Sequence, residues 1–167
     1  MYDEQLGQRW DLMSQTATLR QDYTELTVLF VGSPAVDLEA ACDAECTRPV
    51  DIEVVTDGRA AIQRLTATSD PSASRTRPDL VLLQCDFELP DGMTVLHAIK
   101  SSPRLRATPV VVLDPGDTDI ERTYRTGGNA HVNTPDTIEE YVDLVHSITR
   151  FWFEWAQYPA ESLYSDT

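Results

Sequence analysis

Lysine is almost absent from this sequence of 167 residues. Lys100 is its single lysine, and 13 basic residues stand against 28 acidic ones, which gives a formal net charge of −15 at pH 7. Phosphate contacts need clustered cations, so this composition argues against nucleic-acid binding. An acidic chain nearly free of lysine is typical of proteins that work in concentrated salt, where the Debye length falls toward about 3 Å at 1 M and self-repulsion is screened. The composition therefore favours a halophilic source.

Long apolar runs and cysteines are also scarce. No run approaches the roughly 18 residues of a membrane span, and the N-terminus is polar and acidic rather than a secretory signal. An odd number of cysteines, Cys42, Cys46 and Cys85, is typical of reduced thiols in a cytoplasm. A zinc site at Cys42 and Cys46 would need two more ligands at suitable spacing, and the three histidines stand apart. We expect a cytoplasmic protein without a membrane segment, metal or cofactor.

Short apolar runs of strand length do occur, and they alternate with segments of helical periodicity. The runs are 26–31, 51–56, 80–85, 109–113 and a shorter one around 130–132. Uniformly apolar strands separated by helices are typical of a parallel sheet that is covered on both faces. We predict an α/β fold: a flavodoxin-like, doubly wound sheet of five strands in the order 2-1-3-4-5, with five helices.

Local signals predict where the helices begin. Ser33-Pro34 reads as a cap followed by proline at the first position of a helix that runs to about Cys46. Asp57-Gly58 opens the next helix, and Thr118 with Glu121 forms a capping box. The last helix is expected to be long, because one set of apolar positions follows the 3.6-residue period. This set is Ile138, Tyr141, Val142, Val145, Ile148, Trp152 and Trp155.

The chain is expected to hold one domain with short extensions. Residues 1–24 are polar with sparse apolar positions, which predicts an N-terminal helix or arm outside the main fold. Residues 25–159 form the domain, and 160–167 form a polar tail. Within the domain, residues 69–78 are rich in Ser, Pro and Arg and are expected to form a flexible loop.

Two segments carry a resemblance to a known family. Residues 78–100 (PDLVLLQCDFELPDGMTVLHAIK) resemble the third strand and third helix of response-regulator receiver domains, and residues 102–113 (SPRLRATPVVVL) continue the match. Near the C-terminus, Phe151-Trp152 and residues 156–159 (AQYP) resemble the tail of small receivers that partner phytochrome-like kinases. The resemblance spans about residues 25–159. It implies two-component or phosphorelay signalling, with a sensor histidine kinase or another signalling protein as partner.

Receivers take a phosphoryl group from a phosphohistidine onto an aspartate, and the resemblance implies where that chemistry would lie. Two acidic residues after strand 1 help to hold Mg²⁺, an acceptor aspartate ends strand 3, a Thr or Ser ends strand 4, and a Lys ends strand 5. Matched without gaps, this chain has different residues at all five positions. These are Gly32, Ser33, Gln84, Asp114 and Thr134. The aromatic residue usual in strand 5 is replaced by His131, which we expect at the surface or rim.

Each replacement removes one function. Gly32 and Ser33 cannot supply the anionic ligands that hold a hard cation. Gln84 is an amide and cannot form an acyl phosphate, Asp114 puts negative charge where a phosphoryl group would sit, and Thr134 removes the cation. We predict a phosphorylation-independent pseudo-receiver, not an enzyme, that acts through protein–protein interaction.

Two alternatives stay open. Asp86 lies two residues past Gln84, and a two-residue shift preserves the face of a strand, so Asp86 could serve as a phosphoacceptor. Alternatively, the domain could bind a small ligand in the vacated pocket. The loop at 32–34 has one glycine and no run that would cradle a phosphate, which argues against that reading.

Aromatic residues crowd the C-terminal end within eight positions. They are Phe151, Trp152, Phe153, Trp155 and Tyr158. One helix face cannot hold all of them, and aromatics are enriched at interface hot spots, so we predict a homodimer interface here. In the alternative, Trp152 and Trp155 complete the core while Phe153 is exposed. A further possibility is that Trp10 and Met13 of the arm cover the cluster.

Overall fold

The computed structural model describes residues 25–43, 49–67, 77–86, 90–116 and 120–157. Several predicted features lie outside these residues: the N-terminal arm, most of the loop at 69–78, Thr118 of the capping box and the polar tail.

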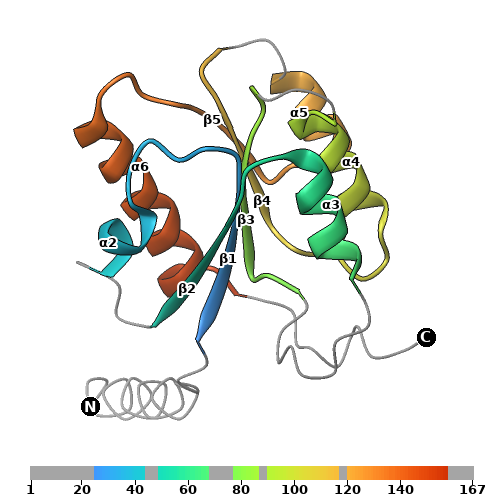
Figure 1. Ribbon diagram of the computed structural model, residues 1–167, viewed down its shortest axis with the longest axis horizontal. Coiled ribbons are helices and arrows are strands. Elements are labelled where there is room, and N and C mark those ends of the chain that lie inside the picture. Colours follow the sequence, from blue (N-terminus) through green and yellow to red (C-terminus); the bar gives the residue numbers. More distant parts are fainter. Residues whose placement is uncertain (1–24, 44–48, 68–76, 87–89, 117–119, 158–167) are drawn as a thin grey trace, which may run out of the picture.

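A single parallel sheet forms the centre of the described chain (Figure 1). Its strands are β1 (Leu26–Val31), β2 (Val50–Val55), β3 (Leu80–Gln84), β4 (Val110–Asp114) and β5 (Ala130–Asn133). The spatial order is β2-β1-β3-β4-β5. This order confirms the predicted flavodoxin-like topology, in which the order of the strands reverses between β1 and β3.

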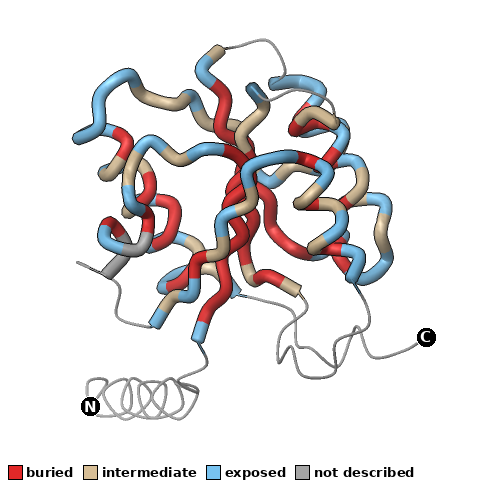
Figure 2. The backbone as a smooth tube through the Cα atoms, in the orientation of Figure 1, coloured by how far each residue is buried: buried red, intermediate tan, exposed pale blue. Residues whose placement is uncertain are grey.

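Helices cover both faces of this sheet. Helices α2 (Leu38–Asp43) and α6 (Ile138–Arg150) pack on one face, and α3 (Gly58–Thr66), α4 (Gly92–Ser101) and α5 (Ile120–Thr126) lie on the other (Figure 1). The strands alternate between the two cores, so that Val28 and Phe30 face α6 while Leu29 and Val31 face the other layer. The central strands are therefore buried on both sides, as Figure 2 shows.

Helix α2 begins later than the Ser33-Pro34 signal predicts. It starts at Leu38, and the side chain of Asp37 accepts a hydrogen bond from the backbone N–H of Ala40 at 3.2 Å. Asp37 therefore acts as the cap, a role for which aspartate is as suitable as serine. Ser33 and Pro34 instead lie in the loop that crosses the carboxyl edge of the sheet, because another side chain holds the Ser33 backbone, as described below.

Other helix starts follow ordinary capping chemistry. Asp57 caps α3 by accepting from the N–H of Ala60 at 2.7 Å, as its sequence predicts. Asp91 caps α4 by accepting from the N–H of Thr94 at 2.8 Å. Thr137 caps α6, a cap that was not predicted from the sequence: its hydroxyl accepts from the backbone N–H of Glu140 at 3.3 Å and donates to the Glu140 carboxylate at 3.0 Å.

The end of the last helix differs from the predicted apolar stripe. Helix α6 continues into a π-helical turn, η1 (Phe151–Trp155), in which the N–H of Ala156 donates to the carbonyl of Phe151 at 2.9 Å. This wider turn moves Phe153 into the core, where it is 7% exposed, and leaves Trp155 69% exposed. Ile138, at the other end of the stripe, is 65% exposed. The predicted burial of Ile138 is wrong, as is the alternative in which Trp155 completes the core while Phe153 is exposed.

Candidate functional site

The predicted site residues meet at one edge of the sheet, where the parallel strands end. Gln84 is the last residue of β3 and Asp114 the last of β4, while Gly32 and Ser33 follow β1. Thr134 follows β5, and its backbone N–H donates to the carbonyl of Asp114 at 2.9 Å. The topology therefore brings all five positions to the edge where doubly wound sheets carry their sites.

Gln84 closes the middle of this edge. The backbone N–H of Ser33 donates to Gln84 Oε1 at 2.6 Å. Gly32 has a φ of +130°, and a Cβ atom there would collide with Oε1, Cβ and Cδ of Gln84. The amide side chain thus lies directly against the Gly32 backbone, which only glycine allows. A second close approach, at Gly92, packs the start of α4 against the backbone of Gln84 and Cys85.

Asp86, the alternative phosphoacceptor, is exposed and lies beyond the end of β3. Strand β3 pairs with β4 in regular register from Val81 through Gln84, so Gln84 and not Asp86 ends the strand. Residues 87–89, including Leu89 of the matched pattern, lie outside the described residues. Burial raises the pKa of Tyr141, in the first turn of α6, and the negative charge of Asp86 adds to this shift, against an opposing effect of the Ala35 backbone.

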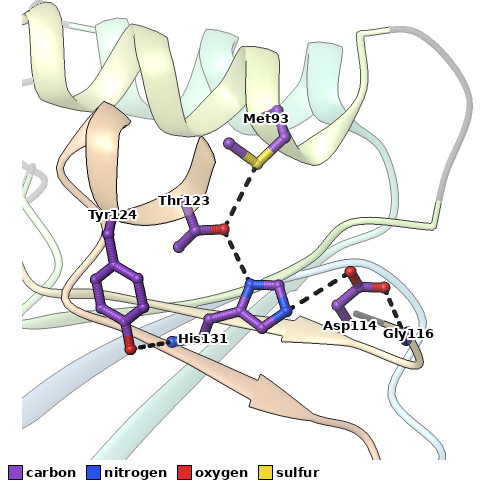
Figure 3. A network of polar contacts seen from close by, with 6 residues as sticks. All are labelled: Met93, Asp114, Gly116, Thr123, Tyr124 and His131. Atoms are coloured by element: carbon purple, nitrogen blue, oxygen red, sulfur yellow. Dashed lines mark hydrogen bonds and ion pairs between the residues drawn. The ribbon is translucent and has the colours of Figure 1, made fainter. Parts of the chain in front are cut away.

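Asp114 is turned toward β5. Its Oδ2 lies 3.7 Å from Nε2 of His131, and its Oδ1 accepts from the N–H of Gly116 at 3.2 Å (Figure 3). The two side chains are nearly excluded from solvent, with 10% of Asp114 and 2% of His131 exposed. The expectation that His131 is a surface or rim residue is therefore wrong. Its ring is buried because it points from β5 into the layer beneath α4 and α5.

Further polar contacts connect His131 to the helices. Its Nδ1 lies 3.0 Å from Oγ1 of the fully buried Thr123, whose hydroxyl also approaches Sδ of Met93 at 3.9 Å. The backbone N–H of His131 donates to the hydroxyl of Tyr124 at 3.3 Å. Neither Thr123 nor Tyr124 could be singled out from the sequence, because both stand in a polar helical segment with no motif. A histidine within an apolar strand was the one available signal.

Lys100 lies at the opposite edge of the sheet, at the end of α4. Its Nζ donates to the carbonyls of Thr108 at 2.7 Å and Arg106 at 3.2 Å, and to Oδ1 of Asn129 at 3.0 Å. Burial lowers the pKa of Lys100 to about 8. The chain's single lysine thus joins the segments before β4 and β5, and it cannot stand in for the lysine that receivers carry after strand 5.

The residues at the carboxyl edge do not fit a Mg²⁺ ion. A hard cation prefers several carboxylate or carbonyl oxygens, whereas the acid-pair positions hold Gly32 and Ser33, and Asp114 is engaged by His131. Across the part of the chain that the structure describes, no group of three or more His, Cys, Asp or Glu side chains is placed to hold a metal. In that same part, no helix is long and apolar enough to cross a membrane.

The predicted interface residues are divided between core and surface. Phe151 and Trp155 are 54% and 69% exposed, whereas Phe153 is buried. Trp152 is half-buried, packs against the core below α6, and meets the Phe151 ring edge-on with centroids 5.2 Å apart. Tyr158 lies outside the described residues. Phe153 therefore cannot contribute to an interface, and Phe151 and Trp155 are the exposed members.

Comparison with known proteins points to one family. No protein-family model matches the sequence. The probable methanogenesis regulatory protein FilR2 of Methanothrix harundinacea is 36% identical over 110 residues, which are 65% of this chain and 70% of that protein. The response regulator Rcp1 of Synechocystis is 29% identical over 137 residues, covering 80% of this chain and 92% of Rcp1.

Solved structures agree with this relationship. The phosphorylated cyanobacterial phytochrome response regulator RcpA has a TM-score of 0.73 and 29% identity, covering 82% of this chain and 100% of RcpA. The shared sheet order and the sequence similarity across most of both chains confirm the resemblance seen in the sequence. The chain belongs to the response-regulator receiver family of two-component signalling proteins.

Proposed function

We propose that this receiver is a pseudo-receiver, which signals without phosphorylation through contacts with other proteins. The observation that carries the proposal is the position of Gln84, whose amide ends β3 and accepts the backbone N–H of Ser33. An amide cannot form the acyl phosphate on which receiver chemistry depends.

The rest of the edge supports the same proposal. In-line phosphoryl transfer requires cations that neutralise the developing charge on the phosphoryl oxygens. The Asp114 carboxylate adds negative charge instead, and Thr134 carries none. Gln84 fills the space over Gly32, which also argues against the small-ligand alternative.

The test is treatment with acetyl phosphate, or with beryllofluoride, in the presence of Mg²⁺. RcpA, whose structure was solved in phosphorylated form, is the positive control. We expect intact-mass measurement to show no phosphoryl adduct on this chain, and tryptophan fluorescence to stay unchanged with either reagent. An adduct or a fluorescence change that is present in the wild type and absent in Asp86→Asn would instead establish Asp86 as a phosphoacceptor.

We also propose that the protein forms a homodimer through its C-terminal end. Phe151 and Trp155 leave large apolar surfaces in water, and burying such a side chain contributes about 1.5–3 kcal/mol. Sedimentation equilibrium at about 100 µM in concentrated KCl should show a dimer that the Phe151→Ala/Trp155→Ala variant loses. Ile120→Ala, which removes an exposed apolar residue from α5, is the matched control. A monomeric wild type would contradict the proposal unless deletion of residues 1–24 creates the dimer, which would identify the arm as the cover.

We propose that the protein acts in the cytoplasm of a halophile and is not an enzyme. Its proposed partner is a sensor histidine kinase or another signalling protein. The acidic, nearly lysine-free composition supports the halophilic part of this proposal. Co-purification from the native host at native salt, with mass-spectrometric identification of bound proteins, would name the partner. Recovery without any signalling protein would count against it.

A further inference from the structure

A buried chain of polar contacts links the carboxyl edge of the sheet to α5. It runs from Gly116 through Asp114, His131 and Thr123 to Met93, as Figure 3 shows. Its parts come from β4, β5, α5 and α4, so that one imidazole ring connects the site edge with two helices.

Few titratable groups face this ring. Among the described residues packed against it, Asp114 is the charged one, and Thr123 and Met93 are neutral. The hydroxyl of Tyr124 faces the His131 backbone and not the ring, and the β5 neighbours Ala130 and Val132 cannot titrate. The charged residues of α5 are exposed to solvent. They are Glu121, Arg122 and Arg125.

The number of protons on the ring decides which of these contacts can form. In the imidazolium both nitrogens are donors, so Nδ1–H donates to Thr123 Oγ1, Nε2–H points at the Asp114 carboxylate, and the Thr123 hydroxyl donates to Met93. A neutral imidazole has one N–H. If the proton is on Nδ1, Nε2 has no hydrogen to present to the Asp114 carboxylate. If the proton is on Nε2, the Thr123 hydroxyl must donate to Nδ1 and can no longer donate to Met93.

Helix α5 presents no broad apolar face to the sheet. It has seven residues, and Thr123 is its buried member. Thr123 and Tyr124, which are adjacent, both contact His131. The outer side of the helix exposes Ile120 by 40% and Tyr124 by 53%. A change at His131 therefore reaches a surface with apolar side chains that a protein partner could contact.

We propose that His131 is a proton-responsive positioning residue, whose protonation strengthens the link between Asp114 and Thr123 and thereby sets the position of α5. Histidine is suited to this role because its charge ordinarily changes between about pH 5 and pH 8. The proposal concerns a switch within the fold and does not depend on self-association or on the absence of phosphorylation.

The test is an NMR titration of the full-length protein from pH 8 to pH 5 in concentrated KCl. We expect the His131 ring resonances and the backbone amides of Thr123 and Tyr124 to shift with one shared midpoint. Asp114→Asn, which removes the carboxylate that faces Nε2, should reduce the size of the α5 amide shifts. Unchanged α5 amides across this range, or α5 shifts that Asp114→Asn leaves at full size, would overturn the proposal.

Two variants separate coupling from a merely structural role. In Thr123→Val the ring should still titrate while the α5 amides no longer follow it, because the hydroxyl link is gone. In His131→Gln the α5 transition should disappear. His97→Gln, on the exposed face of α4, is the matched control and should leave the transition intact. An α5 transition that follows ring titration in Thr123→Val, or that is lost in His97→Gln, would refute the coupling.

Discussion

Single side chains at the edges of this sheet take their roles from partners that lie far away in sequence. The Ser33 backbone and Gln84 are 51 positions apart, yet their hydrogen bond shapes the middle of the carboxyl edge. Lys100 likewise reaches Asn129, which is 29 positions away. Such long-range polar contacts give a residue a function that its type alone does not reveal.

Removing the Lys100 amine should weaken the edge at which α4 ends. Lys100→Met leaves the carbonyls of Arg106 and Thr108 and the amide oxygen of Asn129 without this donor. Because these contacts are partly solvated, we expect a loss of about 1–2 kcal/mol in the free energy of unfolding, measured by denaturant titration. Lys100→Arg should retain part of this stability. An unchanged Lys100→Met midpoint would show that water replaces the amine without cost.

The same lysine should produce a distinct pH dependence. Its pKa of about 8 in the folded protein lies below the ordinary value of 10.5, so the unfolded chain binds more protons between these two pH values. Stability conferred by Lys100 should therefore rise as pH increases through that window. The difference in unfolding free energy between wild type and Lys100→Met should widen from pH 8 to pH 10. A constant difference would mean that burial does not shift this amine.

At the scale of elements, caps and turns decide where each helix begins and ends. Asp91 opens α4 by accepting from both the hydroxyl and the backbone N–H of Thr94, at 2.6 and 2.8 Å. These hydrogen bonds, the one from the hydroxyl most of all, lower the pKa of Asp91 from 3.8. After α6, the π-helical turn η1 determines which aromatic residue packs in the core.

Loss of the α4 cap should destabilise the protein in a pH-dependent way. We expect Asp91→Ala to cost about 1 kcal/mol at pH 7, as measured by denaturant titration. Because the folded pKa is depressed, this contribution is present above the ordinary pKa of 3.8 and is lost as pH falls through the lower folded value. Asp91→Asn, which can still cap the helix, should show little loss at pH 7 and less pH dependence. Equal stability of the Ala and Asn variants would contradict the capping role.

The π-helical turn makes a clear prediction for two neighbouring phenylalanines. Phe153 is 7% exposed and Phe151 is 54% exposed, although both lie in the same turn. Phe153→Ala should cost about 3–5 kcal/mol, because it leaves a cavity in the core. Phe151→Ala should change the stability of the monomer by no more than about 0.5 kcal/mol. Thermal and denaturant unfolding at low protein concentration would compare the two. A larger loss at Phe151 would mean that the turn is not π-helical in solution.

At the scale of the whole molecule, the net charge is the property expected to influence folding stability most. A net charge of −15 on a chain of this length makes the compact state repel itself unless counterions screen it. We predict that the melting temperature rises by several degrees between about 0.1 M and 2 M KCl, since the Debye length falls from about 10 Å to below about 3 Å. Sucrose at matched viscosity is the control for non-ionic stabilisation. Equal melting temperatures in the two salt solutions would remove the argument for a halophile.

Much of this architecture can be predicted from the sequence, because it depends on local periodicity. Uniformly apolar runs between helical segments specify buried parallel strands, and the observed order β2-β1-β3-β4-β5 is the flavodoxin-like one predicted for five such strands. The residues at the carboxyl edge of the sheet can also be identified from the sequence. Once Gln84 and Asp114 are known to end their strands, their chemistry is determined by residue type.

Only the tertiary structure decided how these residues are held. His131 reads as a surface residue, but its ring is buried, with Nδ1 3.0 Å from the Thr123 hydroxyl and Nε2 facing the Asp114 carboxylate at 3.7 Å. The 3.6-residue period places Trp155 on the core stripe, but the π-helical turn adds a residue and brings Phe153 there instead. Sequence patterns report which face of a single element is apolar. The partners of a buried polar group, and the conformation of the last turn of a helix, depend on side chains from other elements. A local sequence pattern carries no information about those side chains.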